Sequence, residues 1–230
     1  MQTKETMMSV KPFAITLDVG TSLANRTGSW RTLKPVYVDR LPPCNAKCPA
    51  GEQCQAWLFH AQSGNYENAW KQIIEDNPFP AVMGRVCYHT CQGACNRNGI
   101  DEPVGINAVE RFLGDYALEK GWQLPVPAAD TGKRILIVGA GPAGLSAAYQ
   151  LRRLGHAVHV VESAEAAGGM MRYGIPKYRL PREVLDQEIA RIAALGVEFE
   201  FGREVKDLNA EMKSAGYDAA FLGAGASLAH

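Results

Sequence analysis

The chain has 230 residues, which is enough for one or two domains with a buried core. Its 24 Lys and Arg residues balance 24 Asp and Glu residues, so the zero net charge offers no general attraction to nucleic acid or to an anionic membrane. No stretch contains the roughly 18 uncharged apolar residues of a membrane span, and the first residues lack the pattern of a secretory signal. We expect a cytoplasmic protein without a nucleic-acid partner.

The first half of the chain predicts a small all-α domain. Residues 1–36 form an extension without sustained periodicity, in which residues 13–19 could be a strand or an extended arm. Between Glu52 and Asp76, apolar residues at helical spacing predict two helices separated by residues 63–65. Pro78 and Pro80 end the second helix, and another apolar stripe over 104–117 predicts a third. We assign residues 37–128 to this domain.

The second half predicts a partial Rossmann-like α/β domain over residues 129–230. Two prolines and a polar cluster in residues 123–133 indicate a linker, with a boundary near residue 128. Apolar runs and helical stripes then alternate along the chain. The expected elements are a strand at 134–138, a helix at 142–154, strands at 157–162 and 197–201 with a helix at 181–195 between them, and a strand at 217–226.

A glycine-rich loop follows the first expected strand. Gly139, Gly141 and Gly144 form G-x-G-x-x-G at the mouth of a helix, and Glu162 ends the next strand. In such a loop the first glycine permits the tight turn, the second lets a pyrophosphate approach, and the third allows close helix packing. A carboxylate at Glu162 suits ribose hydroxyls and repels a 2′-phosphate, so FAD or NAD fits and NADP does not. A glycine turn that binds nothing is the alternative.

All six cysteines lie between Cys44 and Cys95. Residues 87–95 read C-x3-C-x3-C, and residues 44–49 read C-x3-C-P. Regular spacing in a reducing compartment favours thiolate ligands over disulfides. Iron–sulfur clusters use such cysteines, whereas zinc usually shows paired C-x2-C motifs, so a structural zinc site is the weaker alternative.

The run GGMMRYGIPKYRLP at residues 168–181 resembles the flavin-binding segment of a known oxidoreductase family. Its members include the glutamate synthase small subunit, the amino-terminal half of dihydropyrimidine dehydrogenase, and the large subunit of ferredoxin-dependent transhydrogenases. The resemblance covers residues 41–226 and implies that the first glycine loop holds FAD. Glu162 would take the ribose, Met170 and Arg179 would touch the flavin nucleotide, and the backbone of Val205 would meet the adenosine. A surface ion pair is the alternative for Arg179. The loop residues of the implied site are Gly139, Ala140, Gly141, Pro142, Ala143, Gly144 and Gly169.

The same resemblance implies [4Fe-4S] clusters in the helical domain. Cys48, Cys87 and Cys91 would hold one cluster, and Glu110 occupies the position of its fourth ligand. A solvated helix carboxylate is the alternative for Glu110. The second cluster is only possible, because Cys44 and Cys95 remain while residues 36–43 lack the two cysteines that the family usually places there. Cys54, Asp39 or a partner chain could complete its ligand set, and a small buried residue without a metal is the alternative for Cys54.

Family members also carry an NAD(P)H-binding domain and a segment that completes the flavin pocket. Here only residues 223–228 suggest a second glycine loop, so we expect the amino-terminal part of a longer enzyme, or a split subunit completed by another chain. The predicted function is an electron-transfer module of an NAD(P)H-dependent oxidoreductase that serves a partner redox subunit or a ferredoxin-like acceptor. Residues 16–37 are similar to the flavoprotein that accompanies dissimilatory sulfite reductase. The alternatives are a non-catalytic interaction subunit and a zinc-stabilised nucleotide-binding protein.

Overall fold

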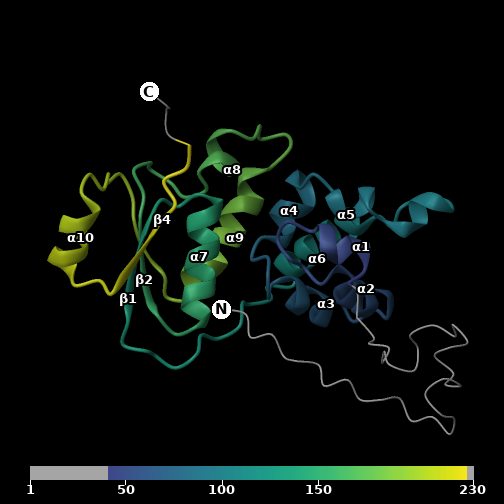
Figure 1. Ribbon diagram of the computed structural model, residues 1–230, viewed down its shortest axis with the longest axis horizontal. Helices are drawn as coiled ribbons and strands as arrows, with labels where there is room; N and C mark the ends of the chain where they lie inside the picture. The colour runs from purple at the N-terminus through teal and green to yellow at the C-terminus, as the bar shows by residue number, and fades with distance from the viewer. Residues whose placement is uncertain (1–40, 227–230) are drawn as a thin grey trace, which may run out of the picture. The chain divides into compact units, whose positions relative to one another are not determined.

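A computed structural model describes residues 41–226 of the chain (Figure 1). The segment 13–19, for which the sequence allowed a strand or an arm, lies outside these residues, as does Asp39. Within the described range, no helix has both the length and the apolar character that a membrane crossing requires.

The first part of the described chain is helical, as predicted. The two helices expected before Asp76 and the one expected after Val104 are present as α2, α3 and α6. Pro80 not only follows the end of α3 but also begins a further helix, α4, which the sequence reading missed. Proline suits a first helical position because its missing N–H would be unpaired there. The elements are α1 (Pro43–Lys47), α2 (Cys54–Gln62), α3 (Tyr66–Ile73), α4 (Pro80–Val86), α5 (Thr90–Gly93), a 3₁₀-helix (Asn96–Gly99) and α6 (Ile106–Glu119).

Helices α4 and α6 pack with their backbones in close contact. A Cβ atom added at Gly84 would clash with the backbone of Arg111, and one added at Gly114 would clash with the backbone of Ala81. Glycine at both positions therefore lets the two helices approach. This crossing matters for the candidate site because Cys87 caps the end of α4 and α6 carries Glu110.

The second part is a parallel four-stranded sheet with its connecting helices, which confirms the predicted Rossmann-like architecture. The strand order is β3-β2-β1-β4, and every pairing is parallel. The strands at the edges are shorter than predicted, and the short α8 and α10 were not predicted. The elements are β1 (Arg134–Val138), α7 (Pro142–Arg153), β2 (Ala157–Val161), α8 (Met170–Tyr173), α9 (Arg182–Ala194), β3 (Glu198–Glu200), α10 (Leu208–Ala215) and β4 (Ala219–Leu222).

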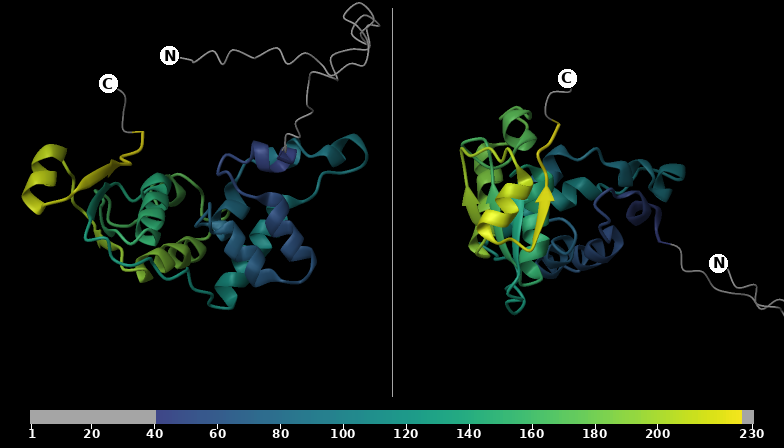
Figure 2. Two further views of the ribbon diagram at one scale, coloured as in Figure 1. Left: turned by 60° about the horizontal axis from the view of Figure 1, so that its bottom comes forward. Right: turned by 60° about the vertical axis from the view of Figure 1, so that its left-hand side comes forward.

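Helices cover both faces of this sheet (Figures 1 and 2). On one face α7 packs against β1 and β2 and also contacts α9. On the other face Leu208 and Met212 of α10 pack against Leu136 and Val161. Asp207 caps the start of α10, because its carboxylate accepts a hydrogen bond from the backbone N–H of Ala210. The central strands are therefore buried on both sides, as the apolar run of β1 predicts.

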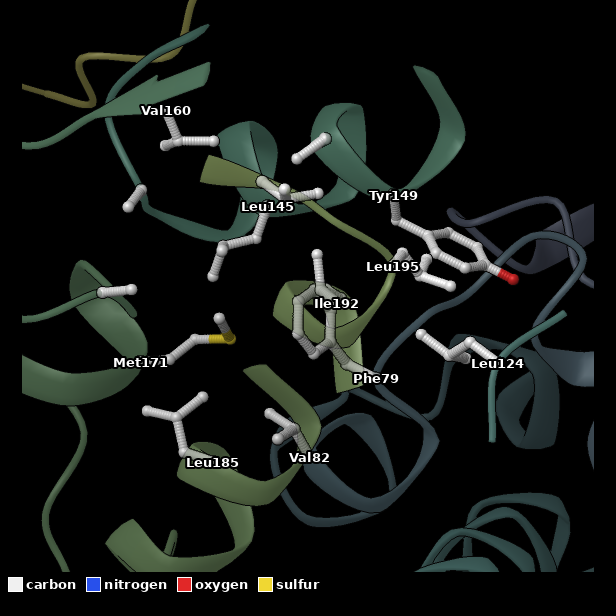
Figure 3. Packing of buried hydrophobic residues seen from close by; sticks show 14 of the residues in the cluster. Phe79, Val82, Leu124, Leu145, Tyr149, Val160, Met171, Leu185, Ile192 and Leu195 are labelled. Carbon is white, nitrogen blue, oxygen red and sulfur yellow. The ribbon is translucent and has the colours of Figure 1, made fainter. Parts of the chain in front are cut away.

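The helical part and the α/β part share one apolar core (Figure 3). Phe79, Val82 and Leu124 from the helical part lie in the same buried cluster as Tyr149 and Ile192. The hydroxyl of Tyr149 donates a 2.8 Å hydrogen bond to the backbone carbonyl of Ile74. The two parts are thus joined by packing and by hydrogen bonds as well as by the chain.

Candidate functional site

Four of the six cysteines belong to one buried group in the helical part. Cys48 caps the end of α1, Cys54 begins α2, Cys87 caps the end of α4, and Cys91 lies in α5. The ligand atoms of Cys48, Glu52 and Cys54 all lie within 4.8 Å of one another. Burial, together with the charges of the neighbouring Cys87 and Cys48, raises the pKa of Cys91 to about 11. The ends of four separate helices thus bring these thiols together.

The thiols of Cys48 and Cys54 differ in their readiness to ionise. A hydrogen bond from the Cys54 thiol lowers the pKa of Cys48 to about 6. The same hydrogen bond, together with burial, raises the pKa of Cys54. Because the thiolate is the form that binds metal, Cys48 is ready to act as a ligand at neutral pH.

Two buried carboxylates lie beside the thiols and share one amide. Asn77 donates hydrogen bonds of 2.9 Å to Glu52 and 3.0 Å to Glu110, and all three side chains are buried. Burial, and then the charge of Cys48, raise the pKa of Glu52 to about 7. Burial, and then the charge of Glu52, raise the pKa of Glu110. Glu110 is therefore not the solvated carboxylate that the sequence left open.

Glu52 and Asn77 were not predicted from the sequence. Glu52 lies two residues before Cys54 in the loop C-P-A-G-E-Q-C, and this proximity to a candidate ligand was the only local signal. Asn77 lies between two helices in a segment with no cysteine, and only the fold brings it to the thiols.

Cys95 stands apart from this group, whereas Cys44 packs, like Cys48, against the apolar cluster that contains Cys54 and Cys91. The thiol of Cys44 donates a 3.6 Å hydrogen bond to the side-chain oxygen of Asn45. Backbone hydrogen bonds from Val104 and Arg97 lower the pKa of Cys95, and no other cysteine contributes to that shift. A second cluster held by Cys44 and Cys95 therefore remains a prediction.

The donor set of the buried group fits an iron–sulfur cluster. Soft thiolates from several loops are the ligands that such clusters use. Here Cys48 and Cys54 lie side by side, and Cys48 and Cys87 are near enough to Cys91 for their charges to raise its pKa. Zinc also accepts four thiolates, so donor chemistry alone leaves both metals open.

The glycine loop of the α/β part has the geometry that its sequence predicts. Gly139 has φ +101°, and a Cβ atom there would clash with the carbonyl of Gly223. A Cβ atom at Gly144 would clash with the carbonyl of Gly139. These two glycines are required by the fold itself, because the start of α7 and the end of β4 both approach the loop.

Gly141 differs from these two glycines, because the space beside its backbone shows whether a pyrophosphate would fit at the loop. A Cβ atom added at Gly141 would meet only Gly169, at 3.9 Å from its Cα atom, which is an ordinary contact. The backbone at Gly141 is extended, with φ −77° and ψ −175°, so no turn requires glycine there. The open space fits a pyrophosphate that approaches the backbone at the start of α7, where Pro142 and Ala143 form the first turn.

The predicted flavin segment lies directly against this loop. The backbone N–H of Gly168 donates a 2.8 Å hydrogen bond to the carbonyl of Ala140, and Gly169 has φ +47°. Met170 then begins α8 with a side chain that is 70% exposed, whereas the neighbouring Met171 is buried. The structure thus brings the two glycine segments together and leaves Met170 accessible.

Glu162 lies at the end of β2 and holds the glycine loop. One carboxylate oxygen accepts a 2.7 Å hydrogen bond from the N–H of Ala140, and the other accepts hydrogen bonds from Ser163 and Ala164. A carboxylate oxygen has two lone pairs, so the first oxygen keeps one for a further donor such as a ribose hydroxyl. Glu162 can therefore both shape the loop and contact a nucleotide.

The two remaining predicted residues lie farther along the chain. Arg179 is exposed, and its side chain forms no salt bridge within residues 41–226, so the alternative of a surface ion pair is not observed there. Val205 is half-buried and packs against the cluster formed by Leu136, Val161 and Tyr217. Their contacts with a nucleotide remain predictions.

Comparison with known proteins distinguishes between the iron–sulfur and the zinc interpretation of the helical part. Residues 39–122 match the family described as dihydropyrimidine dehydrogenase domain II, 4Fe-4S cluster, and residues 137–190 match the NAD(P)-binding Rossmann-like domain. The first match confirms the iron–sulfur domain. The chain is homologous to the glutamate synthase small chain and to a dihydropyrimidine dehydrogenase subunit over both of its parts, in line with the resemblance of its sequence.

Three relatives illustrate this similarity. The chain is 37% identical to the NADP(+)-dependent formate dehydrogenase subunit beta of Moorella thermoacetica, over 80% of this chain and 29% of the relative. It is 40% identical to the NAD-dependent dihydropyrimidine dehydrogenase subunit PreT of Salmonella typhimurium, over 71% and 40%. It is 36% identical to the NADPH glutamate synthase small chain of Mycobacterium tuberculosis, over 81% and 39%. The chain therefore spans well under half the length of each of these relatives.

Proposed function

We propose that this chain is an electron-transfer module that binds FAD at the glycine loop and a [4Fe-4S] cluster at the buried thiols. When bound, FAD supplies two-electron chemistry and the cluster supplies one-electron chemistry. Reduced nicotinamide would react on a complementary domain or chain, and a partner redox subunit or a ferredoxin-like protein would take the electrons. We place the module in the cytoplasm, where thiolate ligands stay reduced.

The observation that carries this proposal is the presence of both sites on one packed unit. Cys48, Cys87 and Cys91 are assembled by helix ends, and Gly141 leaves its backbone open beside the start of α7. The fold does not itself require glycine at position 141, since a Cβ atom there would be tolerated.

The structure also provides a direct connection between the two sites. Helix α4, which ends at Cys87, packs against α9, and the chain reaches α9 directly after Arg179 in the flavin segment. Residues of α4 and α9 belong to the shared apolar core around this contact. The cysteine site and the glycine loop therefore cannot move apart without breaking buried packing. A fixed separation is what electron transfer between two bound groups requires.

An anaerobic reductive titration tests the proposal. The protein reconstituted with iron, sulfide and FAD should accept about three electrons per chain, two in FAD and one in the cluster. G141A should reduce that number to about one by removing FAD, and C87S should reduce it to about two by removing the cluster. These two variants change different sites and serve as controls for each other.

Other outcomes of this titration would contradict the proposal. A colourless protein with one zinc ion per chain would favour the zinc-stabilised nucleotide-binding protein. A chain that takes up neither metal nor flavin would favour the non-catalytic interaction subunit.

A further inference from the structure

We propose that Asn77 is a positioning residue of the iron–sulfur site, whose side-chain amide holds one oxygen of Glu110 and leaves the other oxygen for iron. This inference rests on the proposed function and on the fourth ligand that the family resemblance implies. It adds a residue that does not contact the cluster itself and acts only through Glu110.

Glu110 lies among the thiols with which it would share a cluster. Burial, and then the charges of Glu52 and Cys48, raise the pKa of Glu110. Burial, and to a smaller extent the charge of Glu110, raise the pKa of Cys87. These charges act on one another because the groups are close, and the carboxylate is only 6% exposed. Glu110 therefore faces Cys48 and Cys87 from α6 and has little access to water.

The two oxygens of the Glu110 carboxylate are used differently. Oε1 accepts a 3.0 Å hydrogen bond from the amide of Asn77. Oε2 accepts no hydrogen bond from any group in residues 41–226. Carboxylates that bind metals are commonly held in this way, because a hydrogen bond to one oxygen orients the other. The amide of Asn77 thus fixes the carboxylate while one oxygen stays available.

The amide of Asn77 has only one satisfactory orientation. Its oxygen accepts a 2.9 Å hydrogen bond from the backbone N–H of Phe79, and both of its N–H groups point to carboxylates. A flipped amide would turn its oxygen toward two acceptors and its N–H groups toward a donor. The backbone N–H of Asn77 also donates a 2.9 Å hydrogen bond to the carbonyl of Ile73 at the end of α3. The fold therefore sets this donor before any metal binds.

Glu52 anchors the same amide from the side of the thiols. It accepts a 2.9 Å hydrogen bond from Asn77, and its ligand atom lies within 4.8 Å of the Cys48 and Cys54 sulfurs. One amide therefore joins the loop before α2, the connection between α3 and α4, and helix α6. The position of the Glu110 carboxylate relative to Cys48 depends on this bridge.

Chelation of iron from the full chain tests the inference. The chain is reconstituted anaerobically with ⁵⁷Fe and sulfide and then exposed to EDTA. N77S keeps an oxygen for the Phe79 N–H but lacks the amide donors. It should lose about one iron of about four at an EDTA concentration at least tenfold lower than wild type, and should show the paramagnetic resonance signal of an oxidised three-iron cluster. N68S is the matched control, since Asn68 is exposed in α3.

A double variant shows whether Asn77 acts through Glu110. E110A should release the same single iron as N77S, and N77S combined with E110A should be no more sensitive to EDTA than E110A alone. Additive sensitivities would overturn the inference, because Asn77 would then act on the cluster by another route.

Three further results would overturn the inference. N77S could retain iron as firmly as wild type, or it could fold and lose the whole cluster at once, which a purely structural residue would cause. Mössbauer spectra of the wild type could show sulfur-only coordination at every iron, a result that needs no variant. N77D keeps the side-chain volume and the oxygen for Phe79, so it should give the three-iron signal even if N77S does not fold. A wild-type chain that binds no iron would instead contradict the proposed function, so the two failures are distinguishable.

Discussion

The carboxylate of Glu188 in α9 accepts a 2.9 Å hydrogen bond from the backbone N–H of Ala81 in α4. Glu188 is only 1% exposed, and its other oxygen lies 3.4 Å from the guanidinium of Arg191. That guanidinium lies over the ring of Trp70, with its carbon 5.2 Å from the ring centre. The contact between the helical and α/β parts thus contains the buried pair Glu188 and Arg191 within an apolar core.

This contact predicts a pH-dependent stability. Burial raises the pKa of Glu188 from 4.5 to about 7, although Arg191 opposes the shift. The folded chain therefore keeps this proton at pH values where the unfolded chain has lost it. The stabilisation is fully present below pH 4.5 and is lost as the pH rises toward 7, with a total of about 3 kcal/mol.

Chemical denaturation of wild type and E188Q checks this prediction. The difference between their free energies of unfolding should change by about 3 kcal/mol between about pH 4 and pH 8, because glutamine does not titrate. E183Q is the matched control, since Glu183 lies in the same helix and is exposed. A difference between wild type and E188Q that stays constant across this range would refute the assigned pKa.

The geometry of the glycine loop predicts that two similar substitutions affect different properties, one FAD binding and the other stability. G141A should leave the stability of the flavin-free chain unchanged within about 0.5 kcal/mol but reduce FAD content at least tenfold, because the methyl group would occupy the space of the pyrophosphate. G139A should instead destabilise the chain, because Gly139 has positive φ and its Cβ would clash with Gly223.

Thermal unfolding and flavin release on denaturation measure the two effects separately. Normal FAD content in G141A would show that the loop does not bind the pyrophosphate through this position. The pair is informative because each variant adds the same single methyl group.

Removal of the Glu162 carboxylate should affect both the glycine loop and the affinity for flavin. E162A removes the acceptor of the Ala140 and Ala164 N–H groups, and each hydrogen bond to a charged group contributes about 1.5–3 kcal/mol. We expect the FAD dissociation constant, measured by fluorescence titration, to rise at least tenfold. E165A is the control, since Glu165 is exposed in the same loop. Equal affinities for E162A and E165A would contradict the role of Glu162.

The crossing of α4 and α6 predicts a strong effect of one methyl group far from the metal. G114A should lower the free energy of unfolding by about 1–3 kcal/mol or more, because its Cβ would clash with the backbone of Ala81. G99A is the matched control, since nothing lies within 4 Å of a Cβ at Gly99. Equal unfolding midpoints for G114A and G99A in urea would show that the helices do not pack this closely.

Local sequence patterns were sufficient for the main elements of the fold. The apolar run of β1, the glycine loop and the start of α7 at Pro142 follow from short-range rules, and the structure confirms them. Helix α4 could not be read in this way, because Pro80 was interpreted only as a helix end. Its position depends on packing against α6 at Gly114, which is a long-range contact.

The candidate site was also predictable only in part, because some of its contacts are local in the sequence and others depend on the fold. Cysteine spacing predicted metal-binding thiols, and the family resemblance assigned Cys48, Cys87 and Cys91 to one cluster. Neither could show that Cys54 lies beside Cys48, since that depends on the hydrogen bonds of Asn45. The Asn77 network was likewise invisible in the sequence, because its partners are 25 and 33 residues away.

The analysis of iron, acid-labile sulfide and flavin in the anaerobically reconstituted chain tests the central claim most directly. The account predicts about four irons, about four sulfides and about one FAD per chain. A chain that contains no sulfide and no flavin after reconstitution, whether colourless or loaded with zinc, would contradict it.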